Sequence, residues 1–225
     1  MGKRMKRSEI NLSQKEALEF FQKQNFSLPD WAMWTPEDWK RKGKSVEEIK
    51  KRMLGWDVTD FGKGEFLKFG LLVFTLRNGP SDGSGEPYCE KIIVLRDGQT
   101  LPSHFHWSKT EDIINRGGGR LVIRFWNADD AEGLADTPVR VLVDGGIWKD
   151  VEAGGELAIL PGGSVTLTPR VYHEFSGRGE SVLIGEVSSI NDDTKDNRFL
   201  ETIPRFSTIE EDEPILFYLC NEYPD

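Results

Sequence analysis

Short apolar runs separated by turn residues fill the chain from residue 56 onward, and this pattern constrains the fold more than any other feature. Asn, Asp, Gly or Pro interrupts the runs at 77–80, 97–98, 144–145 and 161–163. Strands that are this short and this regularly interrupted are typical of a β-sandwich or a β-barrel. We expect strands at residues 71–76, 91–95, 121–126, 139–143, 156–160, 164–167, 181–187 and 215–219.

The first quarter of the chain has a helical pattern instead. Ser13 and Glu16 form a capping-box pair ahead of apolar residues, and Thr35-Pro36 is typical of a second helix start. We expect a third helix over residues 45–54. A segment of about 55 residues forms only a marginal core alone. We therefore predict one mainly β domain over 1–225, in which an N-terminal helical extension (1–55) packs on a β-barrel core (56–225).

The composition excludes several classes of partner. The formal net charge is −9, and an acidic protein repels the phosphates of nucleic acid. We interpret the four basic residues between Lys3 and Arg7 as a solvated tail rather than a binding patch. No run approaches the ~20 apolar residues that span a bilayer, and no apolar core of a secretory leader follows the basic start. We therefore expect no membrane partner and a cytoplasmic location.

The two cysteines, Cys89 and Cys220, lie far apart and in no CxxC pattern. We interpret them as free thiols in a reducing compartment, with a disulfide as the alternative.

All three histidines of the chain belong to one hypothesis about a metal site. His104 and His106 are two residues apart, so both imidazoles face the same side of a strand. Glu111 follows five residues later and can add a carboxylate after a bend. A donor set of imidazole and carboxylate suits Mn²⁺, Fe²⁺, Co²⁺, Ni²⁺ or Zn²⁺.

The wider spacing of these residues resembles the first cupin motif. Gly98 is followed after five residues by His104, then after one by His106, after four by Glu111 and after six by Gly118. This resemblance implies a cupin (jelly-roll) β-barrel that holds one metal ion.

A second frame resembles only the opening of the second cupin motif. Gly155, Pro161 and Gly163 have the required spacing, but the histidine expected three positions later is missing. The next histidine is His173, which follows the run at 164–167 and a turn. We take His173 as the fourth metal ligand, reached by a longer hairpin.

Four protein ligands leave two positions free on a metal that prefers six. Two neighbouring oxygens of a 2-hydroxy aldehyde or 2-hydroxy ketone can occupy them, and the metal then acts as a Lewis acid that stabilises an enediolate. Aldose–ketose isomerisation through a metal-stabilised cis-enediol is the reaction that this arrangement favours. An Fe(II)-dependent cupin dioxygenase and a non-catalytic sugar-binding cupin are the alternatives.

Proton transfer also requires a base and an acid near the reacting carbons. We predict Glu186 as the base, because an acidic residue in an apolar strand is costly to bury without a function; its alternative role is to orient a ligand histidine. Lys109, between two ligands, is predicted as the acid or oxyanion stabiliser, with a solvated loop lysine as the alternative. Candidate sugar contacts, each with an ordinary structural alternative, are Lys91, Trp107, Asp193 and Arg205.

Several longer strings along the chain carry a more specific resemblance. They are LGWDVT (54–59), FTLRNG (74–79), HFHW (104–107), EDIINRGGG (111–119), GEVSS (185–189), NDD (191–193) and CNEY (220–223). Through them the chain resembles the D-lyxose isomerases over nearly its whole length. The resemblance implies a manganese-dependent, homodimeric enzyme that interconverts D-lyxose and D-xylulose, and often D-mannose and D-fructose. It also implies that the four metal ligands are His104, His106, Glu111 and His173.

Overall fold

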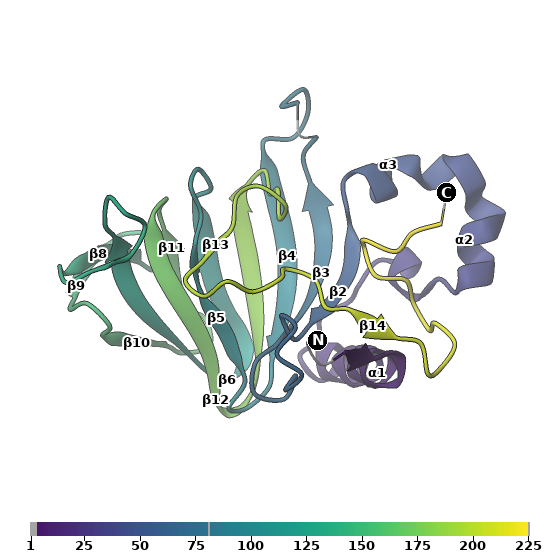
Figure 1. Ribbon diagram of the computed structural model, residues 1–225, viewed down its shortest axis with the longest axis horizontal. Helices are drawn as coiled ribbons and strands as arrows, with labels where there is room; N and C mark the ends of the chain where they lie inside the picture. The colour runs from purple at the N-terminus through teal and green to yellow at the C-terminus, as the bar shows by residue number, and fades with distance from the viewer. Residues whose placement is uncertain (1–3, 81, 225) are drawn as a thin grey trace.

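The computed structural model describes residues 4–80 and 82–224, and its main body is β-sheet (Figure 1). The helices are α1 (Arg7–Lys23), α2 (Pro36–Lys42) and α3 (Glu47–Lys51), with 3-10 turns at Asp30–Met33 and Gly43–Val46. The strands are β1 (Met5–Lys6), β2 (Gly55–Thr59), β3 (Leu71–Asn78), β4 (Tyr88–Leu95), β5 (Thr100–Phe105), β6 (Glu111–Ala128), β7 (Leu134–Ala135), β8 (Val139–Val143), β9 (Ile147–Val151), β10 (Glu156–Ile159), β11 (Ser164–Leu167), β12 (Val171–Ser189), β13 (Arg198–Phe199) and β14 (Ile209–Glu210).

Two long strands, β6 and β12, pair antiparallel along almost their whole length. They belong to one 12-stranded sheet whose two halves pack against each other and are called the first and the second sheet below. Residues 182–189 of β12 also pair with β4, which continues the first sheet through β3 to β2. Residues 173–176 of β12 pair with β5, while β10 pairs with residues 121–124 of β6, and these contacts build the second sheet. The main core lies between the sheets, with Val73, Ile93 and Ile184 from the first and Ile123 and Phe175 from the second. The mainly β, cupin-type prediction is confirmed.

A glycine triplet lets the two long strands bend together. The pairing of β6 with β12 shifts register between Arg178 and Val182, opposite Gly117–Gly119 of β6. Gly118 has a φ of +80°, and a Cβ there would lie 2.0 Å from the main-chain oxygen of Ser181. Only glycine combines this backbone conformation with such a close approach.

The helices gather at the β2 end of the molecule, away from β8 and β9 (Figure 1). Ile10 and Phe21 of α1 share a second apolar cluster with Trp56, Phe74 and Leu183, which face outward from the first sheet. The predicted packing of the N-terminal helix on the sheet is therefore present, and the division into 1–55 and 56–225 stays a prediction. Within residues 4–80 and 82–224, no helix is long and apolar enough to cross a membrane.

Several predicted elements are confirmed and others are wrong. Thr35 caps α2 with Asp38 as expected, but α1 begins at Arg7, so Ser13 lies inside the helix and donates to the Glu9 carbonyl. The third helix is short, and no strand forms over 215–219, where Leu219 makes a single bridge to Trp56. The pattern of apolar runs did not predict strands β2 or β9. Strand β9 lies at the end of the sheet order, and four of its five residues are exposed. It therefore lacks the alternation of apolar and polar residues that identifies a half-buried strand.

The interpretation of the basic start as a solvated tail is wrong for Arg7. Its side chain is fully buried and forms ion pairs with Glu211 (2.7 Å) and Glu222 (2.5 Å). These two contacts tie the start of α1 to the end of the chain, and pairing with carboxylates is what makes a buried guanidinium tolerable. Lys3 lies outside the described residues. Cys89 and Cys220 are both buried and unpaired, as expected.

Replacing Gly118 by alanine should destabilise the protein severely, because the new methyl group collides with main-chain atoms. We expect the free energy of unfolding to fall by at least about 2 kcal/mol more than in Gly98→Ala. Gly98 has a similar φ of +74° but open space at its Cβ position, so it controls for backbone strain. Urea denaturation measures both variants, and equal losses would contradict the close-packed bend.

Candidate functional site

The pocket between the two sheets receives charged side chains from strands whose other inward residues are apolar. Alternation places Lys91 on the same face as Ile93, Glu111 with Ile113, and Glu186 with Ile184. Eight of the ten predicted site residues line this pocket: Lys91, His104, His106, Lys109, Glu111, Glu186, Asp193 and Arg205.

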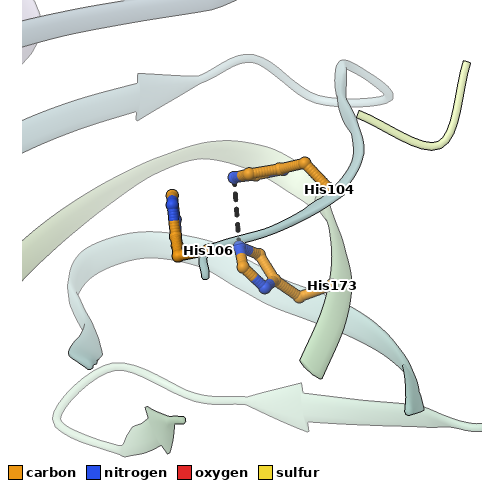
Figure 2. A group of neighbouring side chains, drawn as sticks. All are labelled: His104, His106 and His173. Atoms are coloured by element: carbon orange, nitrogen blue, oxygen red, sulfur yellow. Dashed lines mark hydrogen bonds between the residues drawn. The ribbon is translucent and has the colours of Figure 1, made fainter. Parts of the chain in front are cut away.

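The three histidines converge at one point (Figure 2). His104 lies on β5 and is the register partner of His173 on β12, while His106 follows the end of β5. The Nε2 atoms of His104 and His173 are 3.1 Å apart, and one nitrogen of each ring lies within 4.8 Å of those of the other two. The unbroken two-residue spacing and a cross-strand pair therefore aim all three rings inward.

Main-chain carbonyls determine which nitrogen each ring presents. His104 Nδ1 lies 2.9 Å from the Pro102 carbonyl oxygen, and His173 Nδ1 lies 2.9 Å from the Val171 carbonyl oxygen. His106 Nδ1 lies 2.6 Å from the Asp196 carbonyl oxygen. Because a carbonyl only accepts, each Nδ1 carries a proton, and in the neutral ring the lone pair therefore lies on Nε2. The buried Nε2 of His106 has no hydrogen-bond partner among the described residues. A buried, unpartnered lone pair of this kind is what a metal ion would use.

Burial favours the neutral, metal-binding form of two of the rings. It lowers the pKa of His173 to about 4 and the pKa of His104 well below its usual value. Glu111, at the start of β6, has its two carboxylate oxygens 3.3 Å from the Nε2 of His173 and 3.5 Å from the Nε2 of His106. Burial would raise the pKa of Glu111, but Lys109 and the histidines bring it well below the usual range. Three imidazoles and one ionised carboxylate are a donor set that fits a divalent transition metal.

Two buried lysines flank a second carboxylate beside the histidines. Glu186 Oε1 is 2.9 Å from Lys109 Nζ and 3.4 Å from Lys91 Nζ, and Lys109 Nζ is also 2.7 Å from Glu111 Oε2. Burial opposes the charge on both lysines. The carboxylates around them, first Glu111 for Lys109 and Asp193 for Lys91, more than offset this and raise the pKa of both. Lys109 is therefore not a solvated loop lysine, since only 2% of its side chain is exposed.

Arg205 lies in the pocket but is engaged by two carboxylates. Its Nη2 is 2.6 Å from Asp57 Oδ2 and 3.0 Å from Asp193 Oδ2. Burial raises the pKa of Asp57, and Arg205 partly opposes that rise. Arg205 therefore holds Asp193 toward the pocket.

Trp107 is the predicted sugar contact that this chain does not bring to the pocket. Its ring is 40% exposed and packs edge-on against Phe105, and its Nε1–H donates to Glu132. Alternation explains this position, since Trp107 shares the face of Phe105, opposite that of His104 and His106.

Two polar residues that contact the pocket side chains, the buried Asp57 and the half-buried Asn191, are not among the ten predicted site residues. Asn191 Oδ1 accepts hydrogen bonds from both Lys91 and Lys109. Asp57 belongs to a strand that is buried at every position, so the argument that singled out Glu186 would have found it. Asn191 follows β12 in a polar loop, and no periodic signal distinguishes it from its neighbours.

Removing one imidazole should abolish metal binding without unfolding the barrel. We expect His106→Ala, after incubation with Mn²⁺ and desalting, to retain no stoichiometric metal by inductively coupled plasma mass spectrometry, because the three remaining ligands hold a divalent ion more weakly. Asn197→Ala, in the same pocket, serves as the control and should keep its metal. Full metal content in His106→Ala would contradict the ligand assignment.

Comparison with known proteins agrees with this geometry. The family model described as D-lyxose isomerase matches residues 5–223. The D-lyxose/D-mannose isomerase of Escherichia coli O157:H7 is 47% identical over 97% of this chain and 98% of its own, and that of Serratia proteamaculans is 46% identical over the same shares. The fold is similar to that of the L-ribose isomerase of Acinetobacter sp. DL28 in complex with L-ribose, with a TM-score of 0.61 and 14% identity over 92% of this chain and 98% of that one. By its sequence and its barrel, this chain belongs to the D-lyxose isomerase family.

Proposed function

We propose that this isomerase interconverts D-lyxose and D-xylulose, and also D-mannose and D-fructose. The names of the relatives at 47% and 46% identity support this choice of sugars. The observation that carries the proposal is the Lys109–Glu186 pair, which lies beside the converging histidines and Glu111 inside one pocket. This arrangement supplies a carboxylate base and an ammonium donor within reach of the same small substrate.

Manganese is the metal that we propose, with Co²⁺, Ni²⁺, Fe²⁺ or Zn²⁺ as substitutes. His104, His106, Glu111 and His173 would hold it. When bound, it supplies a Lewis acid that polarises the carbonyl group of the sugar.

Glu186 is proposed to move the proton between the two reacting carbons. In the aldose-to-ketose direction, its carboxylate takes the proton from C2 and returns it to C1, while the proton of the C2 hydroxyl passes to O1, so the sugar passes through a cis-enediol. Both lysines approach the same oxygen, Oε1, which leaves Oε2 for the substrate. The alternative role of orienting a ligand histidine is disfavoured, because all three Nδ1–H groups are already donated to main-chain carbonyls.

The remaining pocket residues are proposed to bind and orient the sugar. Lys109 donates a hydrogen bond to the sugar oxygen on which negative charge develops, and its fixed ammonium stabilises that charge. Lys91 and Asp193 face the pocket and offer a donor and an acceptor for other hydroxyl groups, while Arg205 keeps Asp193 in place. We also propose that the protein is a cytoplasmic homodimer, as its family resemblance implies; size-exclusion chromatography with light scattering tests the dimer.

Isomerase activity should depend on a bound divalent metal and should be highest with D-lyxose and D-mannose. We expect protein stripped with EDTA to be inactive, and Mn²⁺ to restore conversion of D-lyxose and D-mannose to their ketoses, measured by chromatography against D-xylose and L-ribose. Deuterium from the solvent should enter C1 of the ketose. No product from any sugar would refute the isomerase. Oxygen uptake would favour the dioxygenase, and sugar binding without deuterium exchange would favour a binding protein.

The role of Glu186 can be separated from metal binding with an isosteric substitution. We expect Glu186→Gln to keep its metal and lose about a hundredfold or more in kcat, because an amide cannot accept the proton. Glu174→Gln, which changes a half-buried glutamate on the same strand and leaves the pocket untouched, should retain normal turnover. Near-normal turnover in Glu186→Gln would remove it as the base.

A further inference from the structure

The side chain of Asn191 lies between the two lysines of the pocket, although it follows the end of β12 in a loop. Its Oδ1 is 2.9 Å from Lys91 Nζ and 3.3 Å from Lys109 Nζ. A single neutral oxygen therefore accepts a hydrogen bond from each ammonium group, and it links the two cations that flank Glu186.

This contact completes the hydrogen bonding of Lys109. An ammonium group has three N–H donors. The three acceptors around Nζ are Glu111 Oε2 at 2.7 Å, Glu186 Oε1 at 2.9 Å and Asn191 Oδ1 at 3.3 Å. With every donor engaged, rotation of the ammonium group is restrained, so each N–H has a preferred direction before a substrate arrives.

The three bonds of Lys109 are not equally strong. Two go to carboxylates and are short, while the bond to Asn191 goes to a neutral amide and is the longest. The bonds to Glu111 and Glu186 join two opposite charges, whereas the bond to Asn191 joins a charge to a neutral amide and is therefore the weakest of the three. The N–H directed at Asn191 is therefore the one that turns most easily to an oxygen atom of the sugar.

A second asparagine holds Asn191 in this position. Asn78, the last residue of β3, donates from Nδ2 to the Asn191 carbonyl at 2.9 Å and accepts at Oδ1 from the Asn191 N–H at 3.0 Å. The two bonds clamp the main chain at residue 191 to the end of a strand that is 113 positions away in sequence. Neither asparagine lines the pocket: Asn191 reaches the site through its bonds to Lys91 and Lys109, and Asn78 reaches it through its bonds to Asn191.

We infer that Asn191 and Asn78 are positioning residues for proton transfer: Asn191 holds the lysine donors in their catalytic direction and yields one N–H to the sugar, and Asn78 keeps Asn191 there. The inference rests on the proposed isomerase activity and on the roles of Lys109 and Glu186. It predicts an effect on turnover rather than on the binding of metal or sugar, because the lysine direction matters most when negative charge develops.

The test uses the manganese-loaded protein with D-lyxose and compares Asn191→Ala, Asn78→Ala and the double variant with the wild type. We expect each single variant to lose about tenfold to a hundredfold in kcat, with KM changed by less than about threefold, since small misplacement of a catalytic group has effects of this size. Metal content should stay full. The double variant should be no slower than Asn191→Ala alone, because Asn78 acts through Asn191.

Asn127→Ala is the matched control. Asn127 also makes two hydrogen bonds from a strand end, to Thr137 and Pro138, but it does not line the pocket or contact a lysine. Its kcat should be unchanged, while its loss of thermal stability should be similar to that of Asn78→Ala.

Three results would overturn the inference. They are an unchanged kcat in Asn191→Ala, a loss that appears in KM alone, and a double variant whose loss is the product of the two single losses. A wild-type protein without isomerase activity would refute the proposed function instead, so the two failures are distinguishable.

Discussion

The pairing of β6 with β12 is the constraint on which the rest of the structure depends. Both sheets contain these two strands. Because the strands bend at Gly117–Gly119, their continuous ladder of hydrogen bonds curves to form part of the barrel. Glu111 at the start of β6 and Glu186 near the end of β12 lie two register steps apart, and His173 sits at the other end of β12. The bend directs the side chains of both strands into the same barrel interior, and it therefore also brings the residues of the site together.

Electrostatic pairing explains how so many charged groups remain inside the barrel. Isolated buried charges are costly, and charges with good partners are tolerated. Each buried lysine contacts more than one carboxylate, and Arg205 joins Asp57 to Asp193. The result is a set of fixed charges that need little reorganisation when a substrate develops charge, which is the arrangement that favours electrostatic catalysis.

Much of the site was predictable because it follows strand geometry. His104 and His106 share a face through a period of two, and the same alternation puts Lys91 and Glu186 at inward positions of apolar strands. The prediction of Trp107 as a sugar contact overlooked that period, which puts its side chain on the face of Phe105, away from the histidines. Other failures lie where no period applies: Arg7 precedes any amphipathic stripe yet is fully buried. The start of α1 was misplaced because Lys6 occupies the N-cap position, where its main-chain N–H donates to Glu9, and Ser13 only resembles a cap.

By itself, the sequence determined the mainly β class, the inward face of the central strands and the spacing of three predicted metal ligands. These properties are local, since strand alternation and turn residues act over a few positions. Only the tertiary structure decided that His173 meets His104, that Asp57 reaches Arg205 and that Asn78 clamps Asn191. Those contacts join residues 69, 148 and 113 positions apart. The physical reason is that side-chain direction follows from the backbone of each strand, whereas the meeting of distant side chains depends on strand pairing and loop packing across the whole barrel.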